Sequence, residues 1–196
     1  MLSRRAVAVL FASTALLALS ACTSGAPTPD DTAAVTTPQS DISGEWVVTR
    51  TVLSSNDTTN PARAVGATSV RYVLVDRESC DEALCAGTVA SGETADAREE
   101  TALTQTDGGF DYTFTGALDC MNTATGGVLV VDGFDYSQTA TLTAGETGEG
   151  VVAATLAGEI NYTDTVTAAA LEAGCTRDPL TVEVTYAVAA VRPAAG

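Results

Sequence analysis

The most nucleophilic side chains in this sequence are five cysteines, because its 196 residues include no histidine and all nine of its basic residues are arginines. Without histidine or lysine the chain cannot assemble Ser–His–Asp, Cys–His or Ser–Lys catalysis, a Schiff base or a histidine-bound metal. Carboxylates remain, but the adjacent Glu99 and Glu100 point to opposite faces of a strand and cannot flank one bond. We therefore expect no catalytic residues, no enzymatic activity, no cofactor and no metal site.

Cys22 stands directly behind an export signal. The chain begins with Arg4 and Arg5 and continues with an apolar segment that ends in the small residues Ser20 and Ala21. At about 1.5 Å per residue, a segment of roughly fifteen residues is too short to cross about 30 Å of hydrocarbon as a helix. Residues 1–21 are therefore predicted to be a signal peptide.

The sequence Leu19-Ser20-Ala21-Cys22 resembles the lipobox of bacterial lipoproteins at every position. The resemblance implies cleavage before Cys22, diacylglycerol on its sulfur and an acyl group such as palmitate on the new amino terminus. Two or three acyl chains give stable membrane anchoring where one chain is marginal. We expect a lipoprotein held at the extracytoplasmic face of the cell membrane, with its lipid as the membrane contact.

The mature chain is strongly acidic. Its formal net charge is −16, and removal of residues 1–21, which carry two arginines and no acid, lowers it to −18. Such a charge is repelled by nucleic-acid phosphates, so no nucleic-acid partner is expected. Residues 22–40 are rich in Thr, Ala, Pro and Asp without apolar periodicity, which predicts a disordered linker behind the lipidated Cys22.

The other four cysteines predict disulfides, because exported domains with an even number of cysteines usually pair them. Four cysteines allow three pairings. Cys80 and Cys85 are close in the chain, so we pair them with each other and pair Cys120 with Cys175. A zinc site is disfavoured because the chain has neither a Cys-x-x-Cys spacing nor a histidine.

Residues 41–193 alternate apolar and polar side chains in short segments, which is the pattern of half-buried strands. The predicted strands are 45–53, 69–76, 85–91, 98–105, 109–118, 132–143, 151–163 and 180–191. Many short strands in one domain predict an all-β fold: a single antiparallel up-and-down barrel of eight or nine strands, disulfide-bonded, with a β-sandwich as the alternative. Residues 194–196 form a short tail.

Two local sequences predict connections between these strands. Asp107-Gly108 and Asp132-Gly133 each come just before a Phe-Asp-Tyr sequence, and we predict a hairpin turn at each because Asp-Gly tolerates positive φ. Residues 167–175 are predicted to form a helical turn that ends at Gly174.

Gly44 and Trp46 in the first strand, with Arg192 after the last, resemble the pattern of lipocalins and other calycins. The resemblance implies an eight-stranded barrel in which the indole closes one end and the basic residue packs over it. The wider order of Trp46, the close cysteine pair, Cys120, Cys175 and Arg192 resembles a class of small domains exported by high-GC Gram-positive bacteria. That second resemblance implies a fold and a compartment, and no reaction.

The function expected from this barrel is binding. Inward aromatic residues of a wide barrel can line a ligand cavity. The candidates are Phe110, Tyr112, Phe114, Phe134 and Tyr136. We expect a small apolar ligand; the alternative is a packed, ligand-free barrel that serves as a structural or protein-interaction module of the cell envelope.

Overall fold

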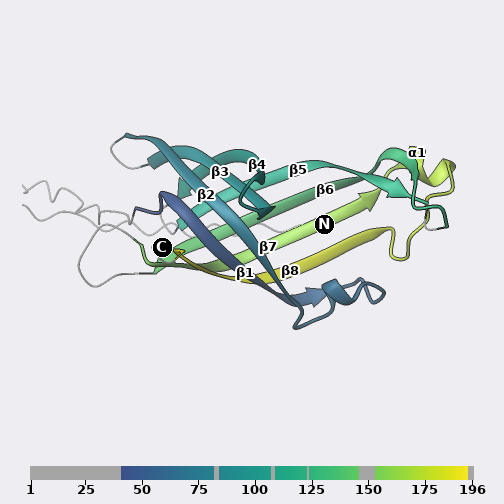
Figure 1. The fold of residues 1–196 in the computed structure, drawn as a ribbon, viewed down its shortest axis with the longest axis horizontal. Coiled ribbons are helices and arrows are strands. Elements are labelled where there is room, and N and C mark those ends of the chain that lie inside the picture. Colours follow the sequence, from purple (N-terminus) through teal and green to yellow (C-terminus); the bar gives the residue numbers. More distant parts are fainter. Residues whose placement is uncertain (1–40, 82–83, 107–108, 123, 146–152, 194–196) are drawn as a thin grey trace, which may run out of the picture. The chain divides into compact units, whose positions relative to one another are not determined.

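The computed structural model describes residues 41–81, 84–106, 109–122, 124–145 and 153–193, with the backbone alone at 78–81, 84 and 85. The predicted signal peptide 1–21, Cys22, the linker to residue 40 and the tail 194–196 lie outside the described residues. The described chain forms β1 (Gly44–Ser55), η1 (Pro61–Arg63), β2 (Thr68–Asp81), β3 (Leu84–Thr94), β4 (Ala97–Thr106), β5 (Gly109–Met121), β6 (Val128–Gly145), β7 (Thr155–Val166), α1 (Ala168–Glu172) and β8 (Thr181–Val191) (Figure 1).

The eight strands form one closed barrel. Each strand pairs antiparallel with its neighbour in sequence, and β8 pairs with β1 to complete the circle. The predicted antiparallel up-and-down barrel is thus confirmed. The alternative, a β-sandwich, is wrong, because a sandwich stacks two sheets face to face whereas this single sheet closes on itself.

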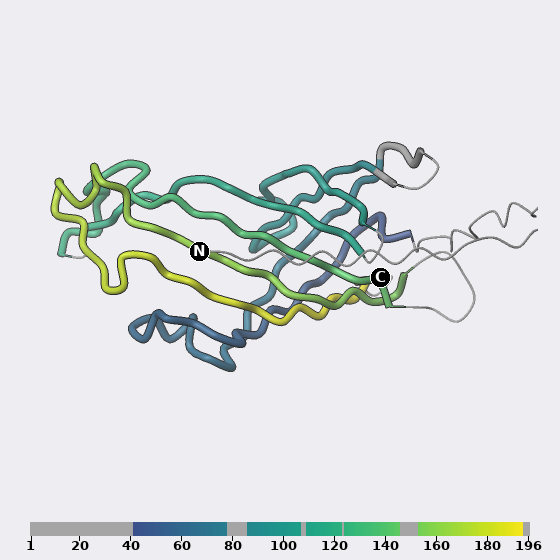
Figure 2. The backbone as a smooth tube through the Cα atoms, turned by 180° about the vertical axis from the view of Figure 1, so that it is seen from behind, coloured from purple at the N-terminus to yellow at the C-terminus, as the bar shows by residue number. Residues whose placement is uncertain are grey.

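The seam between β4 and β5 is short. Within the described residues, pairing across it is limited to Leu103–Thr106 with Gly109–Tyr112. β5 nevertheless stays paired with β6 as far as Met121. β5–β8 therefore extend past the end of this seam toward α1, as Figure 1 shows and Figure 2 shows from behind. We call this extension of β5–β8 the overhang.

Trp46 is almost fully buried near the start of β1, inside the barrel. Its indole Nε1 donates a hydrogen bond to the Ile42 carbonyl at 2.8 Å, and the Arg192 guanidinium lies over its ring at 4.4 Å. Arg192 also donates to three carbonyls, of Asp41, Ser43 and Ala153. The structure thus brings together the two side chains that the sequence pattern singled out, with a cation–π contact of about 0.5–2 kcal/mol.

Gly44 explains why the pattern begins with glycine. Its φ is +106°, in the region that favours glycine, and a Cβ there would come within 3.0 Å of Nη1 of Arg192. A larger residue at position 44 would be strained by the positive φ, and Nη1 of Arg192 would have to move slightly to make room for its Cβ.

Asp132-Gly133 does not form the predicted hairpin turn. It lies inside β6, where the register shifts between the pairs Leu118–Phe134 and Cys120–Val130, so that three residues of β6 oppose one of β5. This is a β-bulge: Asp132 has a φ of +54°, and a Cβ on Gly133 would come within 2.6 Å of Cβ of Cys120. The connection from β5 to β6 is instead closed by two backbone hydrogen bonds: the Asn122 amide donates to the Gly127 carbonyl, and the Gly126 amide donates to the Asn122 carbonyl. The other predicted turn, at 107–108, lies outside the described residues.

The tip of the overhang carries a second, small core. Cys120 of β5 and Cys175 form a disulfide, as predicted, and pack with Val166 and with Ala170 of α1. α1 follows the N-cap Thr167 and is followed by Gly174, which has a φ of +87°. Across the described part of the chain, no helix is both long and apolar enough to cross a membrane.

Candidate functional site

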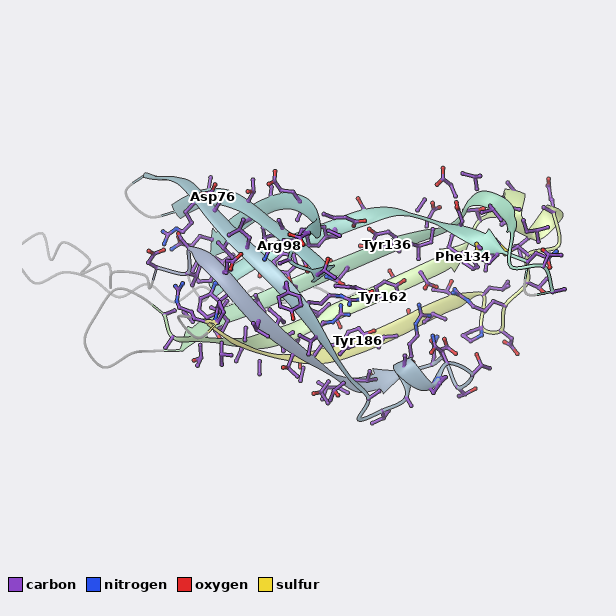
Figure 3. The ribbon with its side chains drawn as sticks, viewed as in Figure 1. Asp76, Arg98, Phe134, Tyr136, Tyr162 and Tyr186 are labelled. Carbon is purple, nitrogen blue, oxygen red and sulfur yellow. A yellow bond between two sulfur atoms is a disulfide. The ribbon has the colours of Figure 1, made fainter. Side chains whose placement is uncertain are left out.

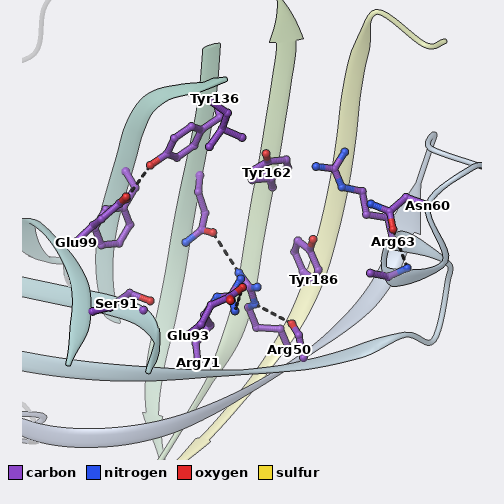
Figure 4. A pocket seen from close by; sticks show the side chains of 17 residues that line it. Arg50, Asn60, Arg63, Arg71, Ser91, Glu93, Glu99, Tyr136, Tyr162 and Tyr186 are labelled. Carbon is purple, nitrogen blue, oxygen red and sulfur yellow. Dashed lines mark hydrogen bonds and ion pairs between the residues drawn. The ribbon is translucent and has the colours of Figure 1, made fainter. Parts of the chain in front are cut away.

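A cavity of about 640 Å³ lies at the mouth of the barrel. Each of the eight strands contributes at least one side chain to its wall, and Asn60, Ala62 and Arg63 of the β1–β2 connection complete it (Figure 4). The β1 residue in its lining is Arg50, so the cavity lies four residues farther along β1 than Trp46. The barrel interior is packed around Trp46, and the cavity lies farther along the strands, where Val52, Val182 and Val184 are again buried.

The cavity begins where the inward residues change from apolar to polar. On β1 the inward series runs Trp46, Val48, Arg50 and then the buried Val52, and Arg50 is the polar member that lines the cavity. The same change occurs on other strands at about the same level, from buried apolar residues to cavity-lining ones. The pairs are Val73 and Arg71 on β2, Val89 and Ser91 on β3, Ala140 and Gln138 on β6, Ile160 and Tyr162 on β7, and Val188 and Tyr186 on β8. This layer of polar and aromatic side chains forms the floor of the cavity.

Arg50 is the most buried charged group of that floor. The residue is 7% exposed. Its Nε donates to the Ser69 hydroxyl and its Nη1 to Oε1 of Gln138, both at 3.3 Å, and its guanidinium lies 4.9 Å from the centre of the Tyr186 ring. No carboxylate lies within ion-pair distance of it in the described ranges of the chain. Burial, and then the neighbouring positive charge of Arg71, lower the pKa of Arg50.

Two further charged pairs stand on the walls of the cavity. Arg71 forms an ion pair with Glu93 at 2.9 Å, and the Tyr136 hydroxyl donates to Oε2 of Glu99 at 2.8 Å. Desolvation and the bond to Glu99 raise the pKa of Tyr136 to about 12. Figure 4 shows Arg50, Arg71 and Glu93 gathered together and Glu99 with Tyr136 on another wall.

Asp164 joins the cavity to the overhang through a buried charge network. Its side chain is 2% exposed. The carboxylate pairs with Nη2 of Arg63 at 2.8 Å and with Arg177. It also accepts a hydrogen bond from the Tyr162 hydroxyl at 2.8 Å. Arg63 also pairs with Asp57 at 3.3 Å and covers the Tyr162 ring at 5.3 Å. Burial and the bond to Asp164 raise the pKa of Tyr162. The network fixes the β1–β2 connection beside the cavity.

The predicted ligand-lining residues are divided between three places. Phe114 and Tyr136 line the cavity. Phe110 and Tyr112 do not: they are buried in the barrel core next to it, where desolvation raises the pKa of Tyr112 to about 12. Phe134 packs on the second core of the overhang and is covered by Arg177 at 4.8 Å (Figure 3).

The sequence analysis missed the polar half of the site. Arg50, Arg71 and Gln138, together with Tyr162 and Tyr186, line the cavity without having been singled out. A signal was present, because Arg50 shares the inward alternation of Trp46 and Val48. Either the alternation of this strand places Arg50 outside the barrel, or the inside of the barrel contains a polar cavity at this position.

Other predicted residues stand apart from the cavity. The backbones of Cys80 and Cys85 pair directly across β2 and β3, but their side chains lie outside the described residues, as Cys22 does. Within the described ranges, no three Cys, Asp or Glu side chains are grouped so that they could hold a metal ion. Comparison of the chain with protein-family models, with curated proteins and with solved structures finds no match.

Proposed function

We propose that this protein is a lipid-anchored binding module of the cell envelope that holds a small molecule in the mouth of its barrel. The cavity of about 640 Å³ carries the proposal, because small-molecule sites typically have volumes of about 300–1,000 Å³ and combine an apolar wall with a few convergent polar groups. Phe114, Leu118 and the tyrosines supply the apolar wall, and Arg50 with Gln138 supplies polar groups. We propose binding and not catalysis.

The lining of the cavity favours a ligand that is partly polar over the wholly apolar ligand expected from the sequence. A wholly apolar molecule would leave the polar groups of Arg50 and Gln138 covered and without water, which costs free energy. A molecule with an apolar body and a polar end satisfies both kinds of lining. The body would lie against Phe114, Leu118 and Tyr162, and the polar end would lie near Arg50.

Blocking the cavity tests this proposal. Ser91 lines the cavity from β3, and Ser91→Trp would fill part of its volume; the neighbouring Ala90 lies on the opposite face of the strand, so Ala90→Trp is the matched control. The chain from residue 23, secreted by its own host behind an ordinary cleavable signal, needs no detergent. Native mass spectrometry should then find an additional mass of small-molecule size on the wild type and on Ala90→Trp, and at least a tenfold lower occupancy on Ser91→Trp.

An adduct that is equally abundant on Ser91→Trp and Ala90→Trp would contradict binding in the cavity. An empty cavity in all three proteins would favour a second proposal, a module that contacts another envelope protein. Apolar side chains exposed at the tip of the overhang support that alternative: Met121, Val128, Leu129 and Val131.

The anchor at Cys22 is also a proposal, supported by Leu19-Ser20-Ala21-Cys22. Metabolic labelling with an alkyne analogue of palmitate should label the wild-type protein, and Cys22→Ser should abolish the label because the thiol is the lipid attachment point. Cys80→Ser is the matched control and should keep the label. Label that persists in Cys22→Ser would show that lipid is attached elsewhere.

A further inference from the structure

We infer that the molecule bound in the cavity is an organic anion, with an apolar body and one negatively charged group that is held by Arg50 and Arg71. The inference rests on the proposed function and names the ligand class for that same cavity. Three features of the cavity lead to it: a buried guanidinium without a carboxylate, a second guanidinium at the rim, and an aromatic wall.

The first feature is the state of Arg50. Arg50 as a whole residue is 7% exposed, and burying an arginine costs several kcal/mol in general unless an anion or several acceptors replace the lost water. Ser69 and Gln138 each accept one hydrogen bond, and no acceptor for Nη2 exists in the described part of the protein. Nη2 thus remains available to an acceptor inside the cavity. A carboxylate or sulfonate of a ligand would supply the missing negative charge.

The second feature is the charge balance around Arg50. Arg71 lines the same cavity, and its partner Glu93 is 79% exposed, so their ion pair is weakly stabilising and can exchange. The remaining lining carboxylate, Glu99, is bound by the Tyr136 hydroxyl on another wall, and Arg63 is neutralised by Asp57 and Asp164. Among the described residues, Arg50 is thus the lining cation with no carboxylate within ion-pair distance, and Glu99, on another wall, is the lining carboxylate with no cation within that distance. This favours a ligand with one negative group over a polyanion.

The third feature is the contrast with the rest of the molecule. The chain has a net charge of −16 and seven arginines after the signal peptide, of which Arg50, Arg63 and Arg71 line this cavity. An acidic surface disfavours non-specific anion binding. The Tyr186 ring beside Arg50 and the Phe114 and Leu118 side chains offer apolar contacts for a body attached to the anionic group. The lining therefore selects for both properties together.

Two fluorescent probes that share one skeleton test the inference. 8-Anilinonaphthalene-1-sulfonate carries a sulfonate, and N-phenyl-1-naphthylamine lacks it. On the mature chain from residue 23, the sulfonate probe should bind about tenfold to a hundredfold more tightly than the neutral one, because hydrogen bonds to charged groups contribute most when the site is desolvated. Arg50→Met, which keeps a similar side-chain length, should remove most of this difference by weakening the binding of the sulfonate probe.

Two matched variants accompany Arg50→Met. Arg71→Gln changes a partly exposed residue, so it keeps the test valid if Arg50→Met fails to fold, and it should reduce the sulfonate preference several-fold. Arg98 pairs with Glu45 and does not line the cavity, so Arg98→Met removes the same charge and should leave both affinities unchanged (Figure 3).

The outcomes separate this inference from the proposed function. Equal affinity for both probes in the wild type, with binding lost in Ser91→Trp, would overturn the anion inference and leave the binding cavity standing. A sulfonate preference that survives both Arg50→Met and Arg71→Gln would also overturn it. Failure of both probes to bind the wild type would overturn the proposed function and the inference together.

Discussion

Replacing Cys120 and Cys175 together with alanine is expected to lower the free energy of unfolding by about 4 kcal/mol. The disulfide closes a loop with a sequence separation of 55, and the chain-entropy model gives roughly this value for such a loop. Both half-cystines are buried with Val166 and Ala170, so the loss of packing adds to the effect. Urea unfolding of the oxidised wild type and the double variant, followed by circular dichroism, measures the difference.

The other cysteine pair provides the comparison. A disulfide between Cys80 and Cys85 would close a much smaller loop, for which the same model gives about 2 kcal/mol. Cys80→Ala with Cys85→Ala should therefore destabilise the protein about half as much. Equal losses, or a greater loss for the Cys80 and Cys85 variant, would contradict the predicted pairing or the entropic explanation of its effect.

Asp164→Asn is expected to lower the free energy of unfolding by about 3 kcal/mol, because removing one partner of a buried ion pair leaves uncompensated charge. The carboxylate is 2% exposed and pairs with both Arg63 and Arg177, whereas asparagine keeps the size of the side chain and removes its charge. The two arginines keep part of their hydration, which places the effect at the lower end of values for buried pairs. For a domain of this size the melting temperature should fall by about 10 °C.

A matched control isolates the burial of Asp164. Asp76 is an exposed aspartate on the outer face of β2, and Asp76→Asn should change the melting temperature by no more than a degree or two (Figure 3). The β1–β2 connection should become less protected from hydrogen exchange in Asp164→Asn, since Arg63 holds it to β7 through this carboxylate. Similar melting temperatures for the two variants would show that the network does not stabilise the overhang.

Much of the fold could be predicted from the sequence, because alternation with a period of two reports directly which face of a strand is buried. In β5, Phe110, Tyr112 and Phe114 are buried as the alternation indicates. The contact between Trp46 and Arg192 was implied by the resemblance of Gly44, Trp46 and Arg192 to the calycin pattern, and the structure contains that contact. The Cys120–Cys175 pairing followed from the short spacing of the other two cysteines.

The prediction from local turn chemistry was wrong near the tip of the overhang. Asp132-Gly133 has the backbone freedom of a hairpin turn, but a bulge makes the same demand for positive φ and a missing Cβ. Which residue pairs with Cys120 decides between a hairpin turn and a β-bulge, and this pairing depends on the register of β5 against β6. The sequence indicates which backbone conformations a residue tolerates, but it does not indicate where that residue pairs in the sheet.

The cavity could be predicted in part. Apolar alternation indicates an inward face but not whether the space behind it is filled, so Phe110 and Tyr112 became candidates although they lie in the core. The level at which several strands change from apolar to polar inward residues marks the cavity floor, and this level requires the register of all eight strands. Arg50, Arg71 and Gln138 are far apart in the chain and meet only through that register.

Tyrosine ring signals in a nuclear magnetic resonance titration test the central claim, that a small molecule occupies the barrel mouth, most directly. The chain has five tyrosines, of which Tyr136, Tyr162 and Tyr186 line the cavity, whereas Tyr72 is exposed on β2 outside it. Addition of 8-anilinonaphthalene-1-sulfonate to ring-labelled protein should shift the three cavity tyrosines and leave Tyr72 unchanged. Saturable binding of the probe with the three cavity signals unmoved would contradict the account.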